Sequence, residues 1–138
     1  MGIFNKATKT NKVNKNIKET KDKAGDITMS LANGEIITTS KEGHKSKYVT
    51  TERLMQLLEK GNFAISIKSG LITLDLEYEL SLEDVCENDS SYILEVILNN
   101  SSAYLTLDKK SLWFVEETAD IDCYTNYWGN GCYCSIYI

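Results

Sequence analysis

Apolar and polar residues alternate in several short stretches of the chain. Residues 27–31 alternate cleanly, and residues 35–39 alternate less regularly, with Asn33-Gly34 between them. Asn and Gly both tolerate a positive φ, so this pair suits the two-residue type I′ turn of a β-hairpin. We therefore expect a hairpin over residues 27–39.

One stretch has the periodicity of a helix. Thr50 or Thr51 can accept a hydrogen bond from an unpaired backbone N–H at a helix start, and Gly61 favours an end after Lys60. The apolar residues between these signals fall on one helical face: Leu54, Met55, Leu57 and Leu58. The pattern predicts one main helix.

Most of the remaining chain has a strand-like pattern. Residues 63–67 and 72–80 present apolar side chains at alternate positions, as strands buried on one face do. The polar residues 81–91 are expected to form a connection with a short helical turn. The later strand-like segments are residues 92–98, 103–107, 112–115 and 132–138. Short strands joined by tight turns favour an antiparallel sheet. The expected fold class is therefore α+β, an antiparallel β-sheet packed by one main α-helix.

Charge is divided unevenly along the chain. Up to Lys23 there are seven lysines and two acidic residues, a net +5, whereas the remainder carries eight basic and eighteen acidic residues, a net −10. The lysines recur about every third position with Asn and Thr between them, which matches no helical face and competes with helix formation. We expect residues 1–25 to be a flexible basic arm and residues 26–138 to be a single domain.

Compartment and source follow from composition. No apolar run approaches the length of a membrane span, and the Lys-, Asn- and Thr-rich start lacks the apolar core of a signal peptide. We therefore expect a cytoplasmic protein with no membrane partner. The absence of proline and the abundance of Lys, Asn and Ile indicate an AT-rich bacterial or phage source.

Four cysteines form the one constellation that suggests a metal. Cys132 and Cys134 would point to the same side of a strand, and Cys123 could supply a third ligand. Either Cys86 or His44 could complete a tetrahedral zinc site of structural type. Buried thiols are an alternative, since cysteine packs as a small hydrophobe, and a disulfide would require an oxidising compartment.

Catalytic motifs are missing from the sequence. There is a single histidine, His44, and there is no phosphate loop, dinucleotide fingerprint or metalloprotease motif. We therefore expect a protein that is not an enzyme. A small metalloenzyme that uses the cysteine site is the catalytic alternative.

Two features favour a binding function. Aromatic residues gather near the carboxyl terminus, where Tyr124, Tyr127 and Trp128 supply the kind of side chain that dominates binding hot spots. Acidic residues gather earlier in the chain, and the expected partner-binding carboxylates are Asp75, Glu77 and Glu79. A negative surface attracts a basic protein and repels nucleic acid.

The leading hypothesis is a non-catalytic inhibitor that blocks a larger basic, nucleic-acid-handling protein. Its most concrete form is a phage-type anti-defence protein such as an anti-CRISPR protein. A toxin immunity protein predicts nearly the same features. A nucleic-acid-binding accessory protein that uses the basic arm is a further alternative, although the acidic body opposes it.

Overall fold

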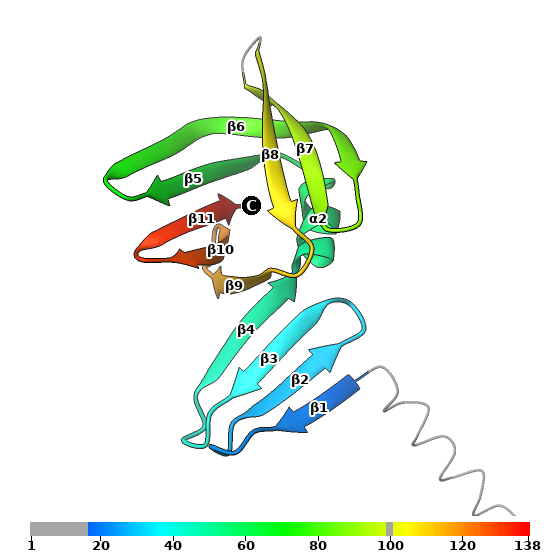
Figure 1. Ribbon diagram of the computed structural model, residues 1–138, viewed down its shortest axis with the longest axis vertical. Helices are drawn as coiled ribbons and strands as arrows, with labels where there is room; N and C mark the ends of the chain where they lie inside the picture. Colours follow the sequence, from blue (N-terminus) through cyan, green and yellow to red (C-terminus); the bar gives the residue numbers. More distant parts are fainter. Residues whose placement is uncertain (1–16, 99–100) are drawn as a thin grey trace, which may run out of the picture. The chain divides into compact units, whose positions relative to one another are not determined.

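The protein divides into two compact units of opposite charge. The computed structural model describes residues 17–98 and 101–138 (Figure 1). The first unit ends at Lys47 and the second is Tyr48–Ile138, so the boundary falls inside the segment for which we expected a single domain. Ten basic and five acidic residues precede Tyr48, a net +5, whereas five basic and fifteen acidic residues follow, a net −10.

The first unit contains three antiparallel strands, which are β1 (Ile17–Lys21), β2 (Ile27–Leu31) and β3 (Glu35–Thr39). The expected hairpin over residues 27–39 is confirmed, but its turn is of another type. Gly34 has a φ of 90° while Asn33 does not have a positive φ, and Gly34 N donates to Leu31 O at 3.2 Å. This is a three-residue loop with a left-handed glycine, and not a type I′ turn.

Strand β1 lies within the stretch that was expected to be a flexible arm. Its backbone pairs with β2 from Ile17↔Leu31 to Lys21↔Ile27. Such pairing supplies hydrogen bonds that local composition does not reveal. Residues 1–16 of that arm lie outside the described residues.

The second unit is an antiparallel sheet of eight strands in the order β4-β9-β10-β11-β5-β6-β7-β8. The strands are β4 (Lys45–Thr50, paired from Tyr48), β5 (Phe63–Ser69), β6 (Ile72–Glu87), β7 (Ser91–Leu98), β8 (Ser101–Asp108), β9 (Leu112–Glu117), β10 (Asp122–Gly129) and β11 (Cys132–Tyr137). The first part of β6 pairs with β5 and its second part pairs with β7. One long strand therefore joins the two parts of the sheet.

The expected α+β fold class is wrong, because most of the described residues lie in antiparallel strands. The described residues contain a single helix, α2 (Thr51–Leu58), which is only 8 residues long. The expected connection over residues 81–91 is mostly strand, since β6 continues to Glu87 through an irregularity between Leu82 and Asp84. The polar side chains there face water from the outer side of a strand, and a bulge interrupts their alternation.

Helix α2 starts where the sequence predicts. Thr50 has extended backbone angles, and its Oγ1 accepts a hydrogen bond from Arg53 N at 3.2 Å. This N-cap satisfies one of the unpaired donors of the first turn. The helix ends at Leu58, two residues before the expected Lys60.

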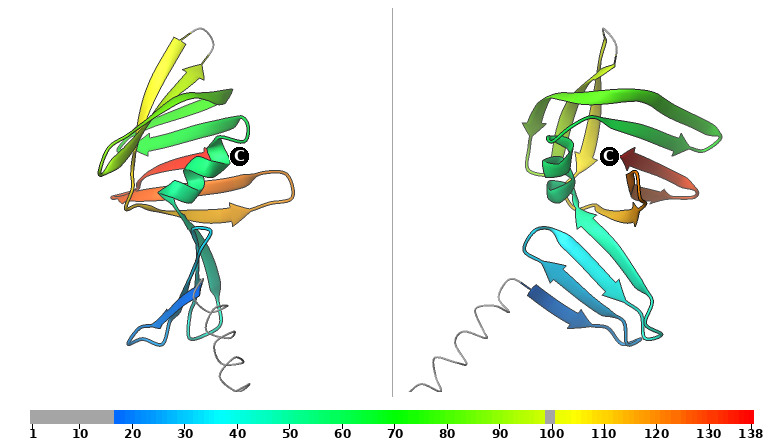
Figure 2. Two further views of the ribbon diagram at one scale, coloured as in Figure 1. Left: turned by 90° about the vertical axis from the view of Figure 1, so that its right-hand side faces the viewer. Right: turned by 180° about the vertical axis from the view of Figure 1, so that it is seen from behind.

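The core of the second unit is formed by two layers of strands together with α2. In Figure 1, β7 and β8 run across the direction of β5, β10 and β11, and Figure 2 shows this crossing from two further sides. The fully buried side chains come from both layers and from the helix: Trp113, Leu54, Leu58, Leu80, Leu94, Ile136, Thr51 and Cys134.

Candidate protein-binding surface

Two hairpin turns lie side by side in the second unit. Strand β11 pairs with β5 from Tyr133↔Lys68 to Tyr137↔Ala64, so the β5–β6 and β10–β11 hairpins are neighbours, and their turns lie on the same side in Figure 1. Gly70 N donates to Cys132 Sγ at 3.3 Å and links the two turns.

Large apolar side chains are exposed at these two turns. Leu71 is fully exposed, and the exposed fractions of the others are 73% for Ile72, 51% for Leu74, 64% for Tyr127 and 51% for Trp128. We call these five residues the hairpin-tip surface. A single exposed apolar residue is ordinary, but a group of them on adjacent turns is typical of an interaction site.

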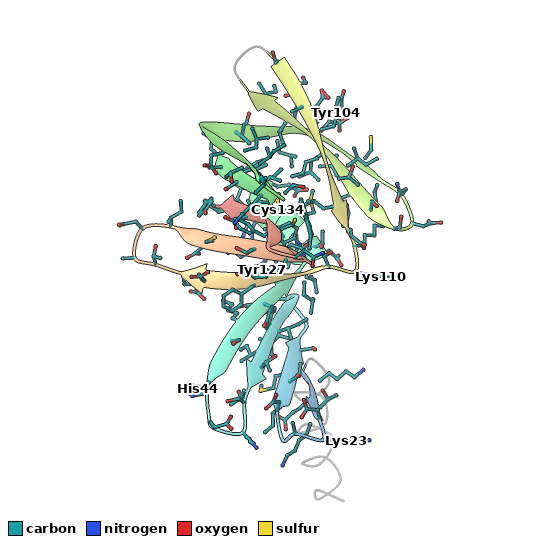
Figure 3. All side chains as sticks on the ribbon, turned by 60° about the vertical axis from the view of Figure 1, so that its left-hand side comes forward. Lys23, His44, Tyr104, Lys110, Tyr127 and Cys134 are labelled. Atoms are coloured by element: carbon teal, nitrogen blue, oxygen red, sulfur yellow. The ribbon has the colours of Figure 1, made fainter. Side chains whose placement is uncertain are left out.

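The side chains of Tyr127 and Trp128 lie on opposite sides of β10. The Tyr127 ring, labelled in Figure 3, packs edge-on against the Tyr133 ring with the two ring centroids 6.4 Å apart. It also lines a hollow of about 200 Å³. Trp128 Nε1 donates to Asn126 Oδ1 at 2.9 Å, and both residues line a separate hollow of about 290 Å³ beside Trp113. The register shift between Tyr127 and Gly129 marks a bulge at this point. The two aromatic rings therefore do not form one anchor.

The β10–β11 turn owes its shape to its sequence. Gly129, Asn130 and Gly131 have φ values of 88°, 53° and 76°. Three consecutive left-handed residues require Gly or Asn, because other side chains are strained in that region. The turn places Trp128 immediately before a sharp reversal of the chain.

The remaining expected aromatic residue, Tyr124, is in the core. It is 7% exposed and faces Val115 on β9 and Ile136 on β11 in register. Its position follows from the alternation of β10, since residues an odd number apart point to opposite sides.

The expected acidic residues all lie on β6. Asp75 is exposed, and its Oδ1 accepts a hydrogen bond from Ser66 Oγ. Glu77 and Glu79 lie on the same strand, but their side chains are outside the described residues. Further along β6, Glu83, Asp84 and Glu87 are exposed. The structure therefore presents acidic side chains along both halves of this strand.

The four cysteines are not brought together. Cys123 faces Tyr137 in register, whereas Cys134 faces Asn126, three residues further along β10. Because paired residues share a face and faces alternate, Cys123 and Cys134 lie on opposite sides of the sheet. Cys132 is half-buried near the β10–β11 turn, and Cys86 is exposed at the end of β6, opposite Ile93. Among residues 17–98 and 101–138, no group of three or more His, Cys, Asp or Glu side chains could hold a metal ion.

Burial dominates the chemistry of Cys134, which is labelled in Figure 3. Its side chain is fully buried, and this burial raises the pKa of the thiol to about 12. Cys134 is therefore a neutral core side chain at ordinary pH. Burial and the neighbouring Cys123 also raise the pKa of Tyr137.

Sequence reasoning missed the β5–β6 half of the hairpin-tip surface. The sequence predicts a turn at Lys68-Ser69-Gly70, but β5 continues to Ser69 and the turn consists of Gly70 and Leu71. A hairpin cannot bury an apolar residue at its own tight turn, so the exposure of Leu71 could have been predicted from the sequence.

No protein-family model, curated protein or solved structure matches the chain. Within the ranges that the structure describes, no helix has the length and apolar character needed to cross a membrane.

Proposed function

We propose that this is a non-enzymatic binding protein whose hairpin-tip surface docks onto a larger, basic partner protein. The observation that carries the proposal is the exposure of Leu71, Ile72, Leu74, Tyr127 and Trp128 on two adjacent turns. Trp and Tyr supply large contact areas with few torsions to immobilise, and they are enriched at binding hot spots.

Charge supports a basic partner. The second unit has a net charge of −10, Asp75 is exposed on β6 near the hairpin tips, and Glu83, Asp84 and Glu87 are exposed further along the same strand. Complementary charge speeds association and selects among partners. Proteins that handle nucleic acid carry basic grooves, and an acidic protein seated there would compete with the phosphates. An inhibitor of such a protein, for example a phage anti-defence protein acting on a CRISPR nuclease or a toxin immunity protein, combines both features.

The experiment uses the full chain as bait in nuclease-treated bacterial lysate, followed by identification of captured proteins and purification of each one. Affinity is then measured by calorimetry for the unaltered protein, for Trp128→Ala and for Leu71→Ser/Ile72→Ser. Ile121→Ser is the matched control, because Ile121 is also exposed, at 43%, but lies before the other end of β10.

We expect Trp128→Ala to weaken binding about thirtyfold, the loss of a hot spot worth roughly 2 kcal/mol. The control should bind as the unaltered protein does, and added salt should weaken all affinities. Equal binding by every variant would contradict the proposal. Capture that requires intact nucleic acid would instead favour a nucleic-acid-binding function.

A further inference from the structure

Within the described residues, the outer edge of strand β8 pairs with no other strand. Strand β8 is the last strand in the sheet order of the described chain. Lys109 N donates to Ser90 O at 2.9 Å, which continues the β7–β8 ladder by one pair. Hydrogen-bonded and non-bonded pairs alternate in an antiparallel ladder, so the backbone N–H and C=O groups of Ser102, Tyr104 and Thr106 point away from β7.

This edge lacks the usual protection against strand addition. Residues 101–107 contain no charge and no proline, and Tyr104, which projects from β8 in Figure 3, is 71% exposed. By contrast, β1 ends the described sheet of the first unit and carries Lys18, Glu19 and Lys21. Charged residues on an edge oppose pairing with another chain. Residues 101–107 of β8 therefore lack the edge charges that β1 carries.

An uncovered part of the core-side face lies next to this edge. Leu74 pairs with Ile67, which also pairs with the buried Cys134, so Leu74 shares the face that forms the core but is half exposed. Thr106 on β8 lines the same hollow as Trp128. In Figure 1 the β5–β6 hairpin continues well past β8 toward its turn, and Figure 2 shows this from behind.

We infer that an extended segment of a partner protein adds to the outer edge of β8 as a further strand. This rests on the proposed function and names the form of the partner's binding segment. Its backbone would bond with Ser102, Tyr104 and Thr106, and its inward side chains would cover Leu74 and Trp128. Main-chain bonds give such complexes affinity, and alternate side chains give them specificity.

The chemistry of the edge defines the segment. Its inward positions are apolar, because they meet the uncovered core-side face. Its outward positions are basic, because the unit carries a net −10 and the edge itself is flanked by Glu95, paired with Tyr104, and Asp108. The same charge disfavours a second copy of this chain, since two such units would repel each other.

The test measures amide hydrogen exchange by NMR on the isotope-labelled full chain. The probe is a synthetic peptide of alternating lysine and valine residues. The control peptide has the same sequence with N-methylated valines, which cannot donate backbone hydrogen bonds. We expect exchange at Ser102, Tyr104 and Thr106 to be fast in the protein alone and to slow about tenfold or more with the probe. The control peptide should leave it unchanged.

Charge variants separate edge pairing from nonspecific attraction. Ser102→Lys/Thr106→Lys should abolish the slowing, because it places like charge against the probe. Ser90→Lys adds one lysine in the β6–β7 turn instead of on the β8 edge, and it should keep the slowing.

Three results would overturn the inference. The first is no slowing with the probe, and the second is equal slowing with the N-methylated control. The third is slow exchange in the protein alone together with a dimer in solution, which would assign the edge to a second copy. If partner binding were nevertheless lost in Trp128→Ala, the proposed function would stand without strand addition.

Discussion

Trp113 and Thr51 are joined by a buried hydrogen bond in which Trp113 Nε1 donates to Thr51 Oγ1 at 3.0 Å. The Thr51 hydroxyl in turn donates to the carbonyl of Asp108 at 2.7 Å. These two hydrogen bonds connect the start of α2 with β9 and with the end of β8. Both side chains are almost completely buried, so neither can turn to water for a replacement partner.

Thr51→Val should destabilise the protein by about 2–3 kcal/mol, because it leaves the Trp113 N–H and the Asp108 carbonyl without this partner. The shape of the side chain is nearly unchanged, so packing contributes little. Urea unfolding measures the loss. Thr51→Ser keeps the hydroxyl and should recover most of the stability; an equal loss in Thr51→Ser would show that the methyl group and not the hydrogen bond matters.

Thr125 and Ser135 should behave as a coupled pair. Their hydroxyl oxygens are 2.8 Å apart across β10 and β11, and both side chains are nearly buried. We expect Thr125→Val and Ser135→Ala each to cost about 1–2 kcal/mol, and the double variant to cost at least about 0.5 kcal/mol less than the sum. The readout is a double-mutant cycle from urea unfolding. Strict additivity would mean that the two hydroxyls do not depend on one another.

The burial of Cys134 predicts a pH dependence of stability. The pKa of the thiol is about 12 in the folded protein, and it is close to its ordinary value of about 8.5 when unfolded. Below the unfolded pKa both states bind the proton, so there is no effect. Above it, only the unfolded state ionises, and stability should fall by about 1.4 kcal/mol per pH unit until the folded pKa is reached.

Cys134→Ala provides the comparison for this dependence. The cavity lowers its stability by a constant amount, but the alkaline slope attributable to Cys134 should disappear. The quantity to compare is the difference in free energy of unfolding between the two proteins from pH 8 to pH 11. A difference that does not change with pH would mean that the thiol ionises equally in both states.

Metal chelation should leave the fold intact. Cys123 and Cys134 lie on opposite sides of the sheet, so the predicted four-cysteine zinc site would need a different strand register. We expect the purified protein to hold well under one zinc per chain by elemental analysis, with an unchanged Tm after EDTA treatment. One tightly held zinc per chain and a large drop in Tm on chelation would restore the four-cysteine hypothesis.

The features that the sequence predicted correctly depend on local signals. The hairpin over residues 27–39 follows from alternation around Asn33-Gly34, and the start of α2 follows from the capping hydroxyl of Thr50. The second half of β6 was misinterpreted because its polar residues interrupt the alternation at a bulge. Strand pairings such as Val49↔Trp113 join segments that are distant in the sequence, so local sequence patterns do not predict them.

The candidate site was predictable only in part. Tyr127 and Trp128 stood out as aromatic residues in a glycine-containing turn, and both are exposed. Their separation onto two sides of β10 follows from the alternation of a strand that continues to Gly129, and composition cannot show where that strand ends. The register between β10 and β11 places Cys123 and Cys134 on opposite sides of the sheet. Leu71 joins the surface only because β5 lies beside β11.

Strand β11 has a consequence for how the protein is made. It lies between β10 and β5, and it pairs with both. A nascent chain that has emerged only as far as Asn130 therefore contains β5 and β10, but it lacks the strand that pairs with both of them. Vectorial synthesis leaves these two edges open until residues 132–137 clear the ribosome, so stalled chains should be held by chaperones or degraded.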